Sequence, residues 1–390
     1  MSIGRFVSRL LPRRSDAAVF DRWTRSLGGR LPDGDVGAYG SSMRDFATAR
    51  LARERAGALG DERLRPVYDS VSFHFVNDGR VNAVAFAEGA RNFIGAYAGA
   101  PPLLADLCMT ALCSRRVWPG AGEAEDGREA AEHLRAFFRA VDLSREPEAD
   151  EMSAFRAGAF RMPGDPIRAR LVNGLFSAAA CFLFHHELGH VIRGHLDLLH
   201  ERGRPMALFE ADGAGVEADD PRLLHWLELD ADRFGAWLTL DLFDWDGAWD
   251  APLSGDPEAF EDHPATALRQ CFLAMGLVFL IFDQHREPLA ANDRRAHPHP
   301  LVRMGALFGE VVSFLHDHHG APWDACTEVM SAALLDLEHV GRDAGLYTIG
   351  VAVQETKEIE DRVRAILSTC REEDLHGAWE RLRQRTAAAR

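Results

Sequence analysis

The sequence has little lysine and no surplus of positive charge. Of its 44 basic residues only Lys357 is a lysine, a bias that fits a GC-rich genome and that carries no recognition code. The formal net charge is −16, and no basic stripe runs along the chain to neutralise phosphates. We therefore expect no nucleic-acid partner.

Cysteine pairs, a leader peptide and long uncharged runs are also missing. The six cysteines form no Cys-x-x-Cys pair, which argues against a zinc finger and predicts buried thiols in a reducing compartment. Met1–Asp16 lacks the apolar core of a secretory signal. The longest uncharged stretches, Leu171–Phe184 and Cys271–Phe282, fall short of the ~20 residues that span a bilayer. We expect a cytoplasmic protein without a transmembrane segment.

What the sequence does contain is the pattern HELGH at residues 186–190. On a helix, positions i and i+4 lie about 40° apart, so the imidazoles of His186 and His190 point the same way. Catalytic zinc commonly takes two such nitrogens, a third protein ligand and a water. Glu187, about 100° round from His186, is placed to act as a general base on that water. The alternative is a pair of histidines that bind no metal.

A second helix carries acids on one face. Apolar residues recur at helical spacing from Leu223 to Leu238, which predicts a buried helix. Acids on such a helix are usually paired or bound to a cation. His225, Glu228 and Asp232 share one face, so any of the three could ligate the metal while another holds the second ring N–H of a ligand histidine. The alternative is a solvated acidic stripe.

A loop rich in histidine and proline follows at residues 297–300, with the sequence HPHP. Each X-Pro unit favours extended backbone, and a helix is predicted to begin near Pro300. His297 is a candidate catalytic residue that would stabilise an oxyanion. A proline-stiffened surface turn is the alternative.

The three segments HELGHxxxGH, ELDADRFG and HPHPLVRM together resemble the gluzincin metallopeptidases, the family that includes the CaaX prenyl proteases and the bacterial heat-shock membrane proteases. The resemblance implies a Zn²⁺ ion, with Glu228 as the third ligand beside the two histidines. It also implies that Asp232 orients a ligand imidazole and that Arg303 supports the loop or the Glu228 carboxylate. The layout has a more distant likeness to soluble phage-exclusion proteases.

Residues 81–86, VNAVAF, resemble the strand that lies along the cleft in this family. The resemblance implies that Asn82, Ala83, Val84 and Ala85 offer free backbone groups to a peptide substrate, which adds to the sheet as a further strand. Arg91–Ala98 is the alternative substrate strand.

The predicted fold class is α+β, with a zincin-like arrangement in which a small antiparallel sheet packs on a long HExxH helix beside large helical additions. Strands are expected at Val71–Asn77, Val81–Ala87 and Arg91–Ala98, the first two joined by a hairpin at Asn77–Gly79. The long helix should begin at Asp165–Pro166 and run through the two histidines. Glu201–Pro221 is expected to be a loop.

Three regions are expected along the chain: an N-terminal helical segment over residues 1–65, a peptidase domain over 66–320 with a helical insertion at about 101–165, and a C-terminal helical extension over 321–390. The expected function is zinc-dependent endopeptidase activity through a metal-activated water. Alternatives are a dedicated regulatory or defence protease that cuts one cellular protein, and a catalytically silent, zinc-stabilised interaction module. Structural zinc needs no Glu187 and usually has a fourth protein ligand, which disfavours the module.

Overall fold

The computed structural model describes most of the 390-residue chain. Within the described residues the protein is mainly helical and has one four-stranded sheet, so the expected α+β class is confirmed. The described residues are 15–56, 62–124, 127–140, 162–209, 220–243, 245, 249, 263–282, 297–346, 356–370 and 372–387.

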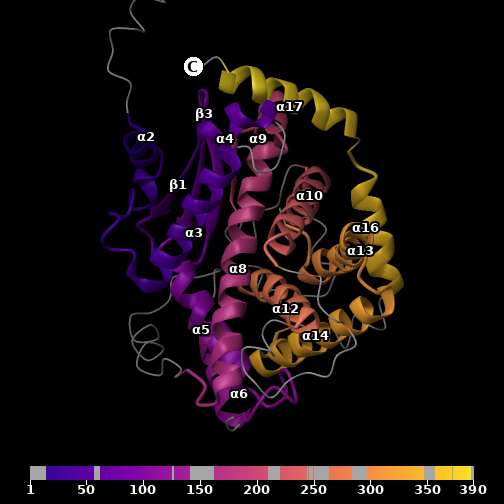
Figure 1. Ribbon diagram of the computed structural model, residues 1–390. Helices are drawn as coiled ribbons and strands as arrows, with labels where there is room; N and C mark the ends of the chain where they lie inside the picture. The colour runs from indigo at the N-terminus through magenta and orange to yellow at the C-terminus, as the bar shows by residue number, and fades with distance from the viewer. Residues whose placement is uncertain are drawn as a thin grey trace, which may run out of the picture.

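Helix α8 (Pro166–Ile192) runs through the middle of the protein, with the sheet on one side and a group of helices on the other (Figure 1). It begins where the sequence predicts. Asp165 caps it by accepting hydrogen bonds from the backbone N–H groups of Ile167 and Arg168, at 2.9 and 3.1 Å, and Pro166 occupies the first turn. The helix carries the HELGH pattern in its last two turns.

The sheet contains β1 (Val71–Val76), β2 (Ala83–Glu88), β3 (Arg91–Tyr97) and β4 (Ala207–Phe209), in the order β1-β3-β2-β4. The first three strands lie where they were predicted, whereas β4 falls inside the predicted loop 201–221. The sheet is mixed, because β1 runs parallel to β3 while β2 is antiparallel to both β3 and β4.

The predicted hairpin at Asn77–Gly79 and the purely antiparallel sheet are therefore wrong. The segment does turn the chain, but β3 lies between β1 and β2. The turn's backbone pairs elsewhere: Asn77 N–H donates to Gly29 O at 2.8 Å, and Gly99 N–H donates to Asp78 O at 3.1 Å. The local turn signal predicted the reversal correctly and the partner strand incorrectly.

The same strand order bears on the expected substrate strand. Strand β4 pairs with β2 along Val84, Ala85 and Phe86, so this part of β2 is not a free edge. The backbone of Asn82 is also engaged, since its carbonyl accepts a hydrogen bond from Tyr97 N–H at 2.9 Å. The alternative strand, β3, is internal to the sheet. Neither candidate strand therefore offers the free edge that a peptide substrate would need to join the sheet.

Both faces of the sheet are covered. On one face, alternate residues such as Ala83 and Ala85 join the main core around α8, and on the other Val84 and Phe86 pack beneath α2 (Asp16–Trp23). Burial on both faces explains why β2 is apolar at successive positions.

The helical side is built around α10 (Pro221–Leu240) and α12 (Pro264–Phe282), which both contact α8 (Figure 1). Helix α17 (Glu372–Ala387) packs on α9 (His195–Glu201) and α4 (Arg65–Ser70), although these elements lie far apart in the sequence. The other helices with named bounds are α3 (Gly37–Arg55), α5 (Ala100–Cys113), α6 (Gly127–Ala140), α13 (Pro300–His319), α14 (Trp323–Ala344) and α16 (Thr356–Leu367).

Two described helices, α8 and α12, are long and apolar enough to cross a membrane by length and composition alone. Each helix is longer than the uncharged stretch within it, Leu171–Phe184 in α8 and Cys271–Phe282 in α12. Their most apolar windows are 67% and 89% buried within the protein, respectively. Central core helices of a globular domain share this length and composition.

Helices α8 and α10 approach each other closely at the HELGH pattern. A Cβ atom on Gly235 would lie 3.0 Å from the backbone nitrogen of His186 and 3.1 Å from its Cα. On the α8 side, a Cβ on Gly189 would lie 3.3 Å from the Cα and the carbonyl oxygen of Ala231. Both glycines are therefore needed for two backbones to pack this tightly.

We predict that Gly235→Ala destabilises the protein by about 1–3 kcal/mol, the usual scale for overpacking a filled core. The matched control is Gly309→Ala in α13, where a Cβ meets nothing within 4 Å. That change should stabilise the helix by up to ~1 kcal/mol. Chemical denaturation measures both. Equal effects of the two substitutions would contradict the tight α8–α10 contact.

Candidate metal centre

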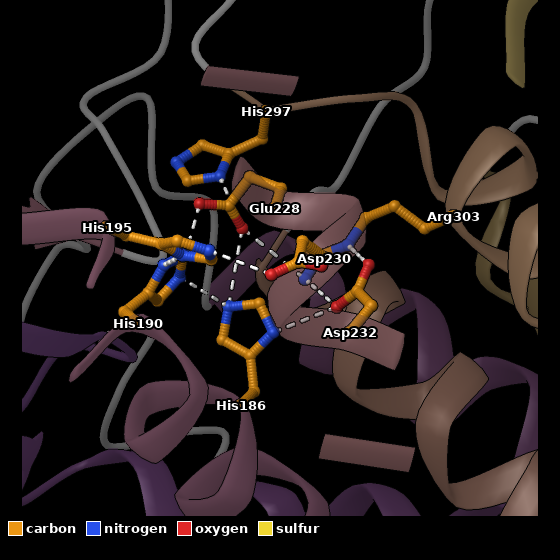
Figure 2. Close-up of polar contacts among 8 residues, drawn as sticks. All are labelled: His186, His190, His195, Glu228, Asp230, Asp232, His297 and Arg303. Carbon is orange, nitrogen blue, oxygen red and sulfur yellow. Dashed lines mark hydrogen bonds and ion pairs between the residues drawn. The ribbon is translucent and has the colours of Figure 1, made fainter. Parts of the chain in front are cut away.

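Three buried side chains from two helices converge at the end of α8. Figure 2 shows His186 and His190 from α8 facing Glu228 from α10. The two Nε2 atoms are 3.0 Å apart, and the Glu228 oxygens lie 3.4 Å from His186 Nε2 and 3.5 Å from His190 Nε2. One ligand atom from each residue lies within 4.8 Å of the others, so this group could hold a metal ion. Of the other candidates for the third ligand, His225 is buried but lies outside the group.

Asp232 and Arg303 fix the ring of His186. The imidazole Nδ1 lies 2.9 Å from Asp232 Oδ1. Arg303 donates to the same carboxylate from Nε at 2.8 Å and from Nη2 at 2.7 Å. A carboxylate so paired only accepts hydrogen bonds, so Nδ1 of His186 carries the ring proton and Nε2 presents a lone pair. Arg303 Nη2 is also 3.6 Å from Glu228 Oε2, and the guanidinium lies over the ring of Phe279.

His190 has a different partner. Its Nδ1 lies 2.9 Å from Nδ1 of His195, whose Nε2 lies 3.0 Å from Asp230 Oδ2. Arg193 donates to both oxygens of Asp230, at 2.8 and 3.0 Å. Burial lowers the pKa of His195, more than Asp230 raises it. Burial alone would raise the pKa of Asp230, but the hydrogen bonds from His195 and Arg193 hold that pKa well below its usual range.

The Glu228 carboxyl is kept in its charged form. The residue is only 1% exposed, and burial by itself would raise its pKa. The surrounding histidines, above all His297 and His190, outweigh burial and hold the pKa of Glu228 well below its usual range. An ionised carboxylate is the state that binds a cation.

The two histidines of the HPHP loop have different places. His297 lies above Glu228, with Nδ1 3.4 Å from Glu228 Oε2 (Figure 2). His299 caps α13 instead, because its Nδ1 accepts a hydrogen bond from Leu301 N–H at 3.2 Å. Of the two, His297 is therefore the one at the metal ligands.

Glu187 follows the first ligand histidine on α8 and is 2% exposed. It does not belong to the three-residue ligand group. The residue is thus a buried acid, about 100° round the helix from His186.

Sequence reasoning missed His195, because this residue lies outside the HELGH pattern and, on a continuous helix, would point about 180° away from His186. The helix ends at Ile192, and Gly194 has a positive φ of 79° before α9 begins. That break turns the His195 ring back onto His190. The available signal was the glycine itself, which is the common residue just past a helix end.

Comparisons with protein-family models, with curated proteins and with solved structures found no match to this chain. The arrangement of the site is therefore interpreted from its own chemistry.

We predict that Glu228→Gln lowers the affinity for Zn²⁺ more than Asp232→Asn does. The first change removes a ligand charge, whereas loss of a partner behind a ligand typically costs about 10–100-fold. Competition with a chromophoric chelator measures both affinities. Glu310→Gln is the control, because Glu310 forms an ion pair with Arg233 and is not one of the ligands.

Circular dichroism would establish that each variant folds. If Asp232→Asn abolishes binding while Glu228→Gln binds as the unaltered protein does, the third ligand has been assigned to the wrong residue.

Proposed function

We propose that this protein is a zinc-dependent endopeptidase with a zincin-like fold of the gluzincin type. The observation that carries the proposal is the donor set: two imidazole Nε2 atoms from α8 and one carboxylate from α10, all buried and facing one point. Two histidines and one acid are the usual three protein ligands of a catalytic zinc. Glu187, buried beside them and outside the ligand group, supports a hydrolytic role.

His186, His190 and Glu228 would hold the ion. When bound, zinc acts as a Lewis acid and lowers the pKa of a coordinated water from ~15.7 towards ~7. Glu187 accepts the proton of the attacking water and later delivers it to the leaving amine. The imidazole of His297, whose Nδ1 lies 3.4 Å from Glu228 Oε2, would donate a hydrogen bond to the oxygen that becomes negatively charged.

The strand order favours a substrate strand different from the one expected. Within the described part of the sheet, β4 (Ala207–Phe209) is the last strand beyond β2. A peptide that extends this side of the sheet would pair with β4, because the β2 edge from Val84 to Phe86 already has a partner.

The interaction-module alternative receives less support. The ligand group holds three residues among those described, and none is a cysteine. All six cysteines are buried and none of them forms a disulfide, a state that suits the proposed cytoplasmic location. The dedicated regulatory or defence protease remains the second proposal, and it differs from a general peptidase only in the number of its substrates.

We predict that Glu187→Gln retains one zinc per chain and loses about 10²–10⁴-fold in peptide hydrolysis, the usual contribution of a positioned general base. Hydrolysis is measured by mass spectrometry on a mixture of synthetic peptides, and zinc by metal analysis. The double variant His186→Ala His190→Ala is the comparison, and it should lose zinc and activity together.

Wild-type rates in Glu187→Gln would remove the base from the mechanism. Full zinc occupancy in the double variant would remove the metal site. A folded, zinc-loaded protein that cleaves no peptide in the mixture, but cuts one protein in a cell extract, would favour the dedicated protease.

A further inference from the structure

The two ligand histidines are held by unequal arrangements. His186 contacts a carboxylate, Asp232, directly. His190 contacts a second imidazole, His195, and only that ring reaches a carboxylate, Asp230. The second arrangement joins the end of α8, the first residue of α9 and the middle of α10 (Figure 2).

The direction of each hydrogen bond in the series His190–His195–Asp230 follows from the last member, Asp230. Asp230 takes two donated bonds from Arg193, so its carboxylate accepts and does not donate. The Nε2 of His195 must therefore carry the ring proton, which leaves its Nδ1 as the acceptor. His190 in turn donates from Nδ1, and the lone pair of its Nε2 faces His186 and Glu228.

We propose that His195 and Asp230 are positioning residues that fix the ring orientation and the tautomer of His190 for metal binding. This inference rests on the metal site of the proposed function and goes beyond the sequence motif, which assigns neither residue. Asp230 acts through His195, and Arg193 holds Asp230 in place.

The surroundings favour a hydrogen-bonding role over space filling. His195 is fully buried, and the ring of Trp226 packs edge-on against it at 6.1 Å between centroids. Gly194 adopts the left-handed conformation that turns the ring back onto His190. A side chain that only filled space here would be apolar, because a buried imidazole needs a partner for each ring nitrogen. Both nitrogens have one.

Two amide substitutions at His195 each keep one of its two hydrogen bonds and remove the other, so their effects can be measured separately. In His195→Asn the side-chain oxygen takes the place of Nδ1, so it still accepts the bond from His190 but loses Asp230. In His195→Gln the amide extends to the place of Nε2, so it still donates to Asp230 but loses His190. We expect His195→Asn to bind Zn²⁺ within about three-fold of the unaltered protein, and His195→Gln to bind about 10–100-fold more weakly.

Asp230→Asn tests whether the acid acts through the histidine. Alone it should weaken Zn²⁺ binding by about as much as His195→Asn does, because both changes break the link between residues 195 and 230. In the His195→Asn background it should add nothing, because the link between residues 230 and 195 is already lost. The matched control is Asp197→Asn, which breaks a comparable two-bond pair with Arg385, at 3.0 Å for each bond, on the same helix as His195. It should leave the affinity unchanged.

Zn²⁺ affinity from chelator competition is the first readout, and the visible spectrum of the Co²⁺-loaded protein is the second, since it reports the geometry of the donors. A shifted Co²⁺ spectrum in His195→Gln and an unshifted one in His195→Asn is expected. Equal losses in both amide variants, or additive losses in the double variant, would overturn the proposal. A protein that binds Zn²⁺ with this pattern but hydrolyses neither the synthetic peptides nor any protein in a cell extract would overturn the proposed function and leave the inference standing.

Discussion

The site depends on the close contact between α8 and α10. Gly235 lets the backbone of α10 lie against the backbone of α8 at His186, and Gly189 provides the reciprocal space. Only at this separation can a carboxylate on α10 reach two imidazoles on α8. The sheet and the outer helices bury the two helices and so hold this contact in place, since a fold supplies its site chiefly by fixing the elements that carry it.

The burial of several acids around one point is the second constraint. Asp230 and Asp232 lie two residues apart on α10, and each is neutralised by an arginine from another segment. Arg303 and Asp232 are both buried, and removing one partner of such a pair costs about 3–5 kcal/mol, because it leaves an uncompensated charge. Each arginine also keeps its carboxylate an acceptor, so Asp232 accepts from the His186 ring and Asp230 accepts from the His195 ring.

The sequence predicted what depends on local order and missed what depends on distant partners. The cap at Asp165, the strands β1 to β3 and the i, i+4 histidines follow from short-range geometry. Pairing of β1 with β3, and the addition of β4 to β2, are set by the packing of the whole sheet, which no turn signal contains. His195 was missed because it lies outside the HELGH pattern, beyond the end of the helix, where one glycine redirects its ring.

The surroundings of Glu228 provide a further argument for a bound cation. The Glu228 carboxyl is buried, and it stays charged because imidazoles surround it: Nε2 of His186 lies 3.4 Å away, Nε2 of His190 lies 3.5 Å away and Nδ1 of His297 lies 3.4 Å away. A cation held by His186, His190 and Glu228 would place its charge directly beside this carboxylate and so would offset the cost of burying it. Metal binding and folding would then be linked, because the ligand atoms of α8 and α10 meet only in the folded protein.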